Sequence, residues 1–477
     1  MHRSGPQSAD ETSDSVSTIS TSPGTPITSP VRGRQLRPGA LLPTAAPLLL
    51  VSGAAVGAFS VSAYHRRVVI SYLVLVAVLA VTAWRGLRRP LPLPGPPAAR
   101  TAGAVALVAA GVLTWTVPAF SYVTGGAADA LRGVGAATAV VAGLVLALPR
   151  RGAPAVALAV AAAGYAAVCA AALRLDPAPR IDVWYTLQGA ADGLLSGQDM
   201  YQQVWIGPPG PMPFFTYLPW TAVLLAPGRW LFGDVRWVLG AVTLGTAVMF
   251  RMLPGDARAR GGAAGLQATA AAALVLLLPG TLTQVEQAWT EPLLLGCLTL
   301  AVLGLARGRG WVAVVGVALA LASKQHVLLL LPVRAAWPRF GPRRAAAAGL
   351  LAAGLVAPWF VADPGAMWHD TVTLLVNFPP LRFADTLSIA VLDEWGVLLP
   401  FGLTGAVVVG TVTAAAVAVR RHDPPPALLL RWCALVLFVA SLVNKQAFYN
   451  QYWLVAGLVL LSWAAAQGPR DDDVTAG

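Results

Sequence analysis

The fold is decided by stretches such as residues 310–333, GWVAVVGVALALASKQHVLLLLPV. This stretch is apolar from end to end except for the Ser323–His326 group at its middle. A helix needs about 20 apolar residues to cross the hydrocarbon core of a bilayer. The strands of a membrane β-barrel instead alternate apolar and polar residues, and this stretch does not alternate. It predicts a membrane-embedded helix that is interrupted near Lys324.

The rest of the chain repeats this pattern. Of its 477 residues, 57% are hydrophobic and only 11% are charged, whereas a soluble protein carries about 25% charged residues. A soluble enzyme and a disordered scaffold are therefore excluded. Further apolar blocks lie at 41–62, 68–84, 102–122, 133–149, 154–173, 216–232, 236–252, 264–282, 289–306, 345–362, 397–419, 427–443 and 450–466. We predict an all-α polytopic membrane protein with about 12–14 apolar helices, some of them re-entrant or broken.

The basic residues indicate orientation. The formal net charge is +12, but the arginines form short clusters between apolar blocks and not one basic face, so no nucleic-acid partner is expected. By the positive-inside rule, Arg32, Arg34 and Arg37 place the N-terminus in the cytoplasm of a cell whose plasma membrane holds the protein. The three cysteines lie inside apolar blocks, where we expect small buried thiols.

Four regions follow from this pattern. Residues 1–38 are rich in Ser, Thr, Pro and Gly and predict a disordered cytoplasmic tail. N-terminal transmembrane helices are expected in 39–150, the main transmembrane domain in 151–466, and a second cytoplasmic tail in 467–477. Two long loops, 174–216 and 363–396, fall on the extracytoplasmic side and carry nine of the 21 acidic residues. Because function concentrates on long loops, we expect the working face there.

Apart from Arg66 and Arg67, which contradict the positive-inside rule, the basic clusters fit a regular crossing pattern only with two adjustments. Block 216–232 must be re-entrant or interfacial, and block 310–333 must divide into two short helices that meet near Lys324. Irregular backbone at membrane depth is tolerated where protein or a water-filled cavity surrounds it. Both adjustments therefore predict a cavity at the extracytoplasmic face.

The first long loop contains an ordered series of motifs. Asp182 follows an apolar block and precedes an amphipathic stretch, 183–195; then come Gly197-x-Asp199-x-Tyr201 and Tyr217-x-Pro219. A lone Asp after a membrane helix is usually a solvated boundary residue, but its position at the start of the longest loop favours a functional role. The chain has only two lysines, Lys324 and Lys445, and each precedes a glutamine. Each either binds a ligand at membrane depth or extends to the headgroups.

These motifs resemble glycosyltransferase family 87, a member of the C-type superfamily of membrane glycosyltransferases that use polyprenyl-phosphate sugars. The resemblance covers roughly residues 150–466 and extends to Ala322–His326 and Asn444–Asn450. It implies a GT-C-like catalytic domain in 151–466. One feature departs from the family pattern. The Asp-bearing loop usually follows the first helix, whereas about five blocks precede it here. Either the chain has extra N-terminal helices or the relevant carboxylate is another one, with Asp129 as the weaker substitute.

The resemblance implies an inverting hexosyltransferase, moving mannose from a polyprenyl-phosphate donor to an envelope lipid or glycan. Asp182 would be the general base, since transfer to a hydroxyl requires removal of its proton. The donor phosphate would be bound by Lys324, Lys445 and His326, lysine being a common phosphate ligand. Candidate sugar- or acceptor-binding residues are Asp199, Tyr201, Tyr217, Gln284, Glu286, Gln446 and Tyr449. No metal-binding motif is present outside the tail, and no cofactor is expected.

Other interpretations stay open at this stage. His326 may be structural, Gln284 and Glu286 may only mark a membrane boundary, and the aromatic residues largely suit an interfacial belt. The main functional alternative is a multi-pass transporter or a lipid or polyprenol flippase. Transporters place broken helices near the bilayer midplane and often contain repeats, and no repeat is evident here. A non-catalytic envelope assembly protein is the third possibility.

Overall fold

The computed structural model describes residues 66–88, 94–117, 120–203, 205, 214–254 and 262–466. The predicted tails, 1–38 and 467–477, and the first apolar block, 41–62, lie outside these residues. Among the described residues, all regular elements are helices. The prediction of an all-α polytopic membrane protein is confirmed.

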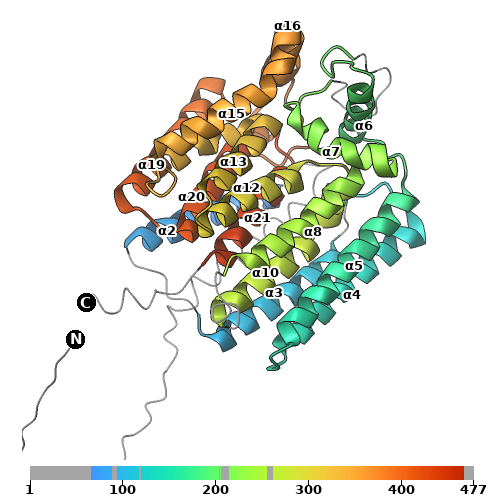
Figure 1. Cartoon of the computed structure of the whole chain (residues 1–477), viewed down its shortest axis with the longest axis vertical. Helices are drawn as coiled ribbons and strands as arrows, with labels where there is room; N and C mark the ends of the chain where they lie inside the picture. Colours follow the sequence, from blue (N-terminus) through green and yellow to red (C-terminus); the bar gives the residue numbers. More distant parts are fainter. Residues whose placement is uncertain are drawn as a thin grey trace, which may run out of the picture. The chain divides into compact units, whose positions relative to one another are not determined.

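Six helices are long and apolar enough to cross a membrane. They are α2 (Arg66–Arg88), α3 (Pro96–Thr116), α4 (Gly125–Ala147), α5 (Ala153–Leu175), α15 (Gly341–Ala362) and α19 (Phe401–His422). Figure 1 shows α3, α4 and α5 side by side, while α2 lies apart from them against α20 (Pro426–Leu442). Each of these six helices leaves much of its apolar surface unburied by protein, as expected for helices that face lipid.

Shorter helices form the centre of this bundle. They are α10 (Ala263–Leu277), α12 (Glu291–Ala306), α20 and α21 (Tyr449–Ala464), and most of their residues are buried on every side. At about 1.5 Å per residue they extend only some 23–26 Å, less than the hydrocarbon thickness. Because other helices surround them, their ends contact protein, and they do not need to span the bilayer alone. All three cysteines are buried and unbridged, as predicted.

Both predicted irregularities are present. Block 310–333 divides into α13 (Gly310–Ser323), the 3-10 helix η2 (Gln325–Leu330) and α14 (Leu331–Ala336), with the break at Lys324. Block 216–232 becomes α7 (Trp220–Phe232), which meets α8 (Arg236–Met252) at 115°. This bend is the geometry of a broken span or a re-entrant segment, as the sequence required.

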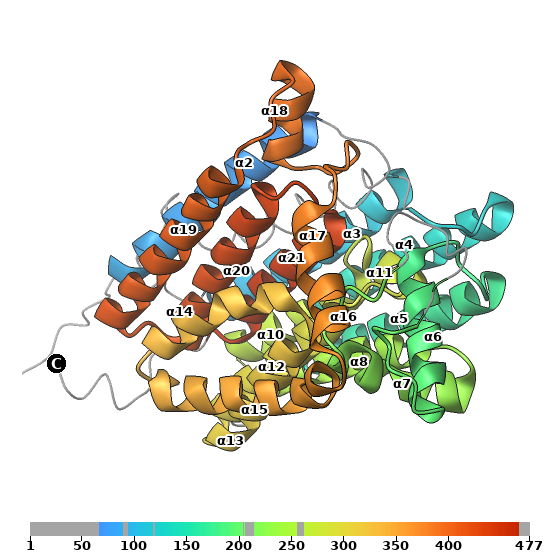
Figure 2. The same ribbon diagram turned by 90° about the horizontal axis from the view of Figure 1, so that it is seen from above.

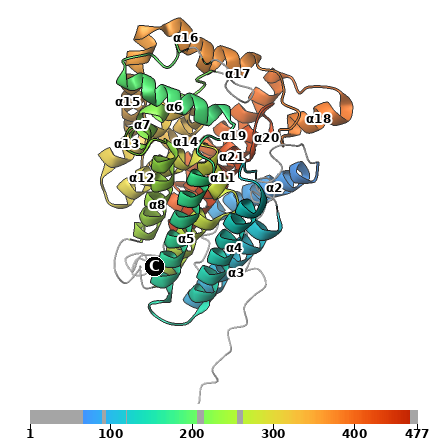
Figure 3. The same ribbon diagram turned by 90° about the vertical axis from the view of Figure 1, so that its right-hand side faces the viewer.

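Short helices from the two long loops gather at one end of the bundle, which we call the loop end (Figure 3). They are α6 (Asp182–Leu195), α16 (Pro364–Trp368), the π-helical turn η3 (His369–Thr373), α17 (Leu374–Asn377) and α18 (Leu387–Trp395). Viewed from above, α16 and α17 lie over the central part of the bundle and α6 lies near α7 (Figure 2). The amphipathic stretch predicted at 183–195 is thus helix α6.

A buried arginine fixes α6 and α8 relative to the bundle. The Arg236 side chain is fully buried, and its guanidinium pairs with Asp234 at 2.7 Å. Nη1 donates to the backbone carbonyl of Glu286 at 3.1 Å, and Nη2, which also contacts Asp234, donates to that of Asp176 at 2.8 Å. Trp184 of α6 packs over the guanidinium and donates to the same Asp234 carboxylate. A buried charge needs such a complete set of partners, and here those partners connect four elements.

Candidate active site

A cavity of about 560 Å³ lies at the loop end. Its walls come from segments far apart in the sequence: the start of α6, residues 214–217, the break after α13, and residues 444–451. The loop between α3 and α4 contributes Phe120 and Tyr122. The N-terminal helices therefore help to form the cavity that the later segments were expected to build.

Asp182 lines this cavity as the first residue of α6. Ile181 before it is extended, and the backbone N–H of Val183 donates to the Asp182 Oδ1 atom at 2.9 Å. The positive end of a helix dipole favours a carboxylate in this position. The Asp182 side chain is largely buried, with 8% of the residue exposed. Burial raises the pKa of the neighbouring Tyr122, and the negative charge of Asp182 adds to that rise.

The break after α13 places Lys324 in the same cavity. The Lys324 backbone is extended, with φ −152° and ψ 132°, which ends the helix at Ser323. The Ser323 carbonyl, which the helix no longer uses, accepts hydrogen bonds from the N–H of Leu218 at 3.2 Å and the hydroxyl of Thr221 at 2.6 Å. Unsatisfied backbone groups at membrane depth are costly, so these two donors make the break stable.

The Lys324 ammonium is paired with a buried carboxylate. Its Nζ atom lies 2.5 Å from Glu291 Oε1 and 3.2 Å from the Thr290 hydroxyl oxygen. Glu291 is fully buried at the start of α12. The ring of Tyr217 lies 5.2 Å from Nζ, within range of a cation–π contact. Lys324 and Tyr217 both line the cavity, so two predicted residues meet there.

The two residues after Lys324 differ in their contacts. The Gln325 amide donates to the Thr216 carbonyl at 2.8 Å and to the Thr371 carbonyl at 3.1 Å, joining two walls of the cavity. His326 also lines the cavity. Its Nε2 atom is buried and has no hydrogen-bond partner among the residues described. A ring nitrogen in this situation is available to a bound water or ligand.

The Gly-x-Asp-x-Tyr motif supports the cavity from behind. Gly197 ends α6 with φ +69°, a left-handed conformation that favours glycine. Asp199 Oδ1 accepts from the Tyr201 N–H at 2.9 Å, and the Tyr201 hydroxyl donates to the Tyr217 carbonyl at 2.8 Å. Asp199 and Tyr201 do not line the cavity. They hold the segment that presents Tyr217.

The second lysine motif, Asn444–Asn450, contributes several residues to the cavity wall, but its lysine is not one of them. Gln446 lines the cavity, and its amide donates to the Pro379 carbonyl at 3.2 Å. Lys445 does not line it; its ammonium donates to the Val376 carbonyl at 2.6 Å and to the carbonyl of Phe378. Burial lowers the pKa of Lys445. Tyr449 is buried in the bundle, where its hydroxyl donates to the Gly280 carbonyl at 3.1 Å.

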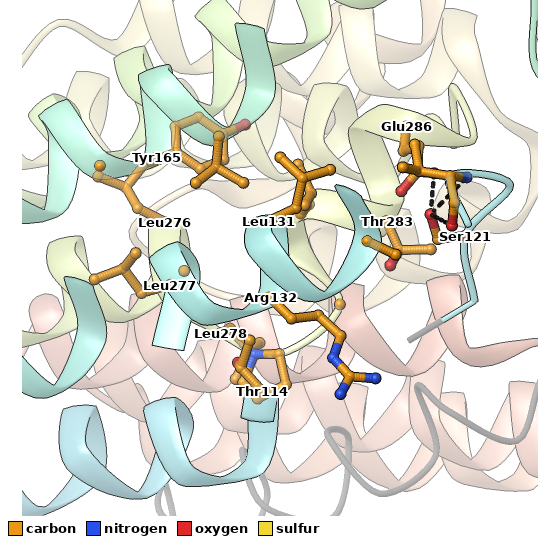
Figure 4. Close-up of a pocket in the computed structure, with 18 residues that line it drawn as sticks. Thr114, Ser121, Leu131, Arg132, Tyr165, Leu276, Leu277, Leu278, Thr283 and Glu286 are labelled. Atoms are coloured by element: carbon orange, nitrogen blue, oxygen red, sulfur yellow. Dashed lines mark hydrogen bonds between the residues drawn. The ribbon is translucent and has the colours of Figure 1, made fainter. Parts of the chain in front are cut away.

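Gln284 and Glu286 lie outside the cavity, on the short helix α11 (Thr281–Glu286). Gln284 is fully buried. The Glu286 carboxylate accepts hydrogen bonds from the Ser121 hydroxyl and, at 3.2 Å, from the Tyr122 N–H. Figure 4 shows Glu286 and Ser121 joined at the edge of a separate, smaller pocket. Glu286 thus holds the loop between α3 and α4, whose aromatic residues line the main cavity.

Sequence reasoning missed several residues of the cavity. Arg180 lines it, and its guanidinium lies 5.5 Å from the Tyr122 ring. Asn444 and Asn450 line the opposite wall. Glu291, the partner of Lys324, had a detectable signal, because an ionisable residue in an apolar block marks a functional hypothesis by default. Arg180 also had a signal in the sequence, because it lies two residues before Asp182.

The cavity combines one carboxylate, Asp182, with two cations, Arg180 and Lys324, and Glu291 lies behind the second. Such a set can accept a proton and neutralise an anion. In the described part of the chain, no group of three or more His, Cys, Asp or Glu side chains has the spacing of a metal site. The chain matches no protein-family model and no curated protein sequence.

Proposed function

We propose that this protein is an inverting membrane glycosyltransferase that uses a polyprenyl-phosphate sugar, with mannose as the expected hexose. The observation that supports the proposal is the meeting of Asp182, Lys324 and His326 in one cavity. Asp182 lies about 140 positions before Lys324 and His326, and the sequence predicted each of the three as a site residue. The cavity's position at the loop end suits a lipid-linked donor with a water-soluble head.

The proposed step is a single displacement at the anomeric carbon. Asp182 accepts the proton of the acceptor hydroxyl as its oxygen forms a bond to that carbon. The bond from the anomeric carbon to the phosphate oxygen breaks, and the electron pair leaves with the lipid phosphate. A β-linked donor then yields an α-linked product. The N–H of Val183 and the positive end of the α6 dipole stabilise a negative charge at Asp182.

The leaving phosphate gains a second negative charge, which the cavity must stabilise. Lys324 and Arg180 are the cations that line it. Glu291 pairs with Lys324, and Arg180 adds a second positive charge to the cavity lining. Donors fixed before the reaction stabilise developing charge more effectively than water does. We assign both cations to the donor phosphate, with His326 beside them.

The location follows the same proposal. The loop end faces the extracytoplasmic side of the plasma membrane, and the N-terminus lies in the cytoplasm. The donor sugar is presented from the outer leaflet, and the acceptor is an envelope lipid or glycan.

The test uses the full chain in lipid nanodiscs with a radiolabelled polyprenyl-phosphate mannose and crude envelope lipid as acceptor source. Wild type should transfer label, and Asp182→Asn should reduce the rate at least a hundredfold, the range of a lost general base. Asp129→Asn is the matched control, because Asp129 pairs with Arg132 outside the cavity and should keep wild-type transfer. Equal transfer by wild type and Asp182→Asn would refute the assignment of the base.

One observation favours a second candidate. A broken helix with a buried ion pair at Lys324 is also a feature of transporters. A transporter or flippase would move an intact lipid or solute between leaflets without cleaving a glycosidic bond. Intact donor recovered from the opposite leaflet, with no labelled product, would favour this second function.

A further inference from the structure

Helix α6 separates the cavity from a second hollow. Asp182 and Thr186 face the cavity, while Trp184, Tyr185 and Gly189 line a pocket of about 730 Å³ on the other side. Among the described residues, Asp199, Gln203 and Trp205 contribute to the opposite wall. We call this hollow the α6–Trp205 pocket. Its volume lies within the 300–1,000 Å³ typical of small-molecule sites.

Three side chains that line this pocket each have a polar atom without a protein partner. Asp199 Oδ2, Gln203 Nε2 and Trp205 Nε1 are buried and have no hydrogen-bond partner among the described residues. One is an acceptor and two are donors. Buried polar atoms without partners are rare and imply bound water or a ligand. A sugar hydroxyl donates and accepts, so a ring with several hydroxyls can satisfy this mixed set.

The helix surface is shaped to hold the tryptophan. A Cβ atom at Gly189 would lie 2.4 Å from Trp205 Cζ3, and one at Gly193 would lie 1.9 Å from Gln203 Nε2. The two glycines, one turn apart on α6, therefore allow Trp205 and Gln203 to lie against the helix. The Tyr185 ring meets the Trp205 ring edge to face, with centroids 6.4 Å apart. Aromatic rings beside hydrogen-bonding side chains match the apolar faces and hydroxyl edges of a sugar ring.

The charges of the pocket select against anionic ligands. Its charged lining residues are Asp192, Asp199 and Arg229. Arg229 is already bound to Asp192, with Nε and Nη2 at 2.7 and 2.9 Å from the two carboxylate oxygens. The formal charges of the described lining residues sum to one negative charge, and these residues include no unpaired cation for a phosphate or a uronate. A neutral ligand fits this balance.

Shared lining residues connect this pocket with the cavity. A hollow of about 560 Å³ lies between them. Phe214 lines both this hollow and the main cavity, and Gln203 and Trp205 line both this hollow and the α6–Trp205 pocket. A ligand that spans all three hollows must be extended. A chain of linked sugars has that length and the required chemistry.

We propose that the α6–Trp205 pocket is a binding subsite for a neutral oligosaccharide, the distal end of a glycan acceptor whose reacting end lies in the cavity. Trp205 provides the ring against which one sugar packs, and Asp199 and Gln203 bind its hydroxyls. The role as acceptor subsite rests on the proposed glycosyl transfer. The binding of an oligosaccharide in this pocket does not depend on that proposal.

The test measures equilibrium binding of tritiated neutral mannotetraose and glucotetraose to the full chain in nanodiscs. Wild type should bind at least one of them, and Trp205→Ala should weaken that binding about tenfold, the factor expected for one aromatic contact. Gly189→Ala should weaken it similarly by displacing Trp205, although alanine favours a helix and preserves the fold. Gly354→Ala, in a helix position with no neighbour within 4 Å, should bind as wild type does.

Two outcomes would overturn the subsite: neither tetrasaccharide binds wild type, or Trp205→Ala binds as tightly as wild type. Failure of the transferase proposal would look different. Tetrasaccharide binding that depends on Trp205 would persist in a protein that transfers no sugar, and also in Asp182→Asn. Conversely, the protein could transfer sugar to a tetrasaccharide with the same KM in wild type and in Trp205→Ala. That result would support the transferase proposal and refute the proposed subsite.

Discussion

The Lys324–Glu291 pair yields a sharp quantitative prediction. The two charged atoms lie 2.5 Å apart, and the side chains are 13% and 0% exposed. Opposite unit charges at that separation attract by about 6–7 kcal/mol at an effective dielectric constant near 20. Desolvation of both groups offsets most of this attraction. Removal of one partner still costs about 3–5 kcal/mol, because it leaves an unpaired buried charge.

We therefore expect Glu291→Gln and Lys324→Met each to lower the free energy of unfolding by about 3 kcal/mol. The double variant should lose about the same amount and not the sum, since no unpaired charge remains. Unfolding in mixed micelles with a rising fraction of sodium dodecyl sulfate, followed by circular dichroism, measures all four proteins. Additive losses, within about 0.5 kcal/mol, would show that the two charges are not coupled and would refute the reasoning.

Three further predictions concern residues that stabilise the fold around the cavity. Arg236→Met leaves the Asp234 carboxylate buried without its partner and should lower the free energy of unfolding by about 3–5 kcal/mol in the same titration. An unchanged free energy would refute the role of Arg236 in fixing α6 and α8. Tyr201→Phe removes the hydrogen bond to the Tyr217 carbonyl, so we expect a loss of about 1 kcal/mol and, if transfer is established, a raised KM with little change in kcat. Gly316→Ala places a Cβ 2.7 Å from a backbone carbonyl of α12 and should cost about 1–3 kcal/mol, while Gly354→Ala should not destabilise.

Much of the fold was predictable because the membrane imposes strong rules. Apolar block length located the helices, and the distribution of arginines required irregularities at 216–232 and 310–333. The structure contains both, with a 115° bend after α7 and a break at Lys324. Helix α6 was visible from its amphipathic spacing. Block length, the positions of the arginines and amphipathic spacing can all be read from the sequence, so these features of the fold could be predicted without the structure.

The direction of individual side chains was not predictable in the same way. Lys445 shares its Lys-Gln context with Lys324, yet its ammonium donates to carbonyls at the end of α17, away from the cavity. Tyr449 points to Gly280 inside the bundle. Which face of a helix meets a cavity depends on packing between distant segments, and apolar blocks that are buried all round carry no periodic signal of it.

The loop between α3 and α4 shows the same limit. Phe120 and Tyr122 belong to the predicted apolar block 102–122, and no residue of the loop was predicted to belong to the site. Its place in the cavity wall depends on Glu286, 165 residues away from Ser121. The N-terminal helices therefore contribute to the cavity through a contact that only the tertiary structure reveals.

The most direct test of the central claim is the structure of the full chain in nanodiscs with a bound polyprenyl phosphate, determined by electron cryomicroscopy. We predict that the phosphate lies in the 560 Å³ cavity, within hydrogen-bond distance of Lys324 or Arg180, with Asp182 facing the space beside it. A phosphate bound elsewhere on the protein, with this cavity empty, would contradict the account.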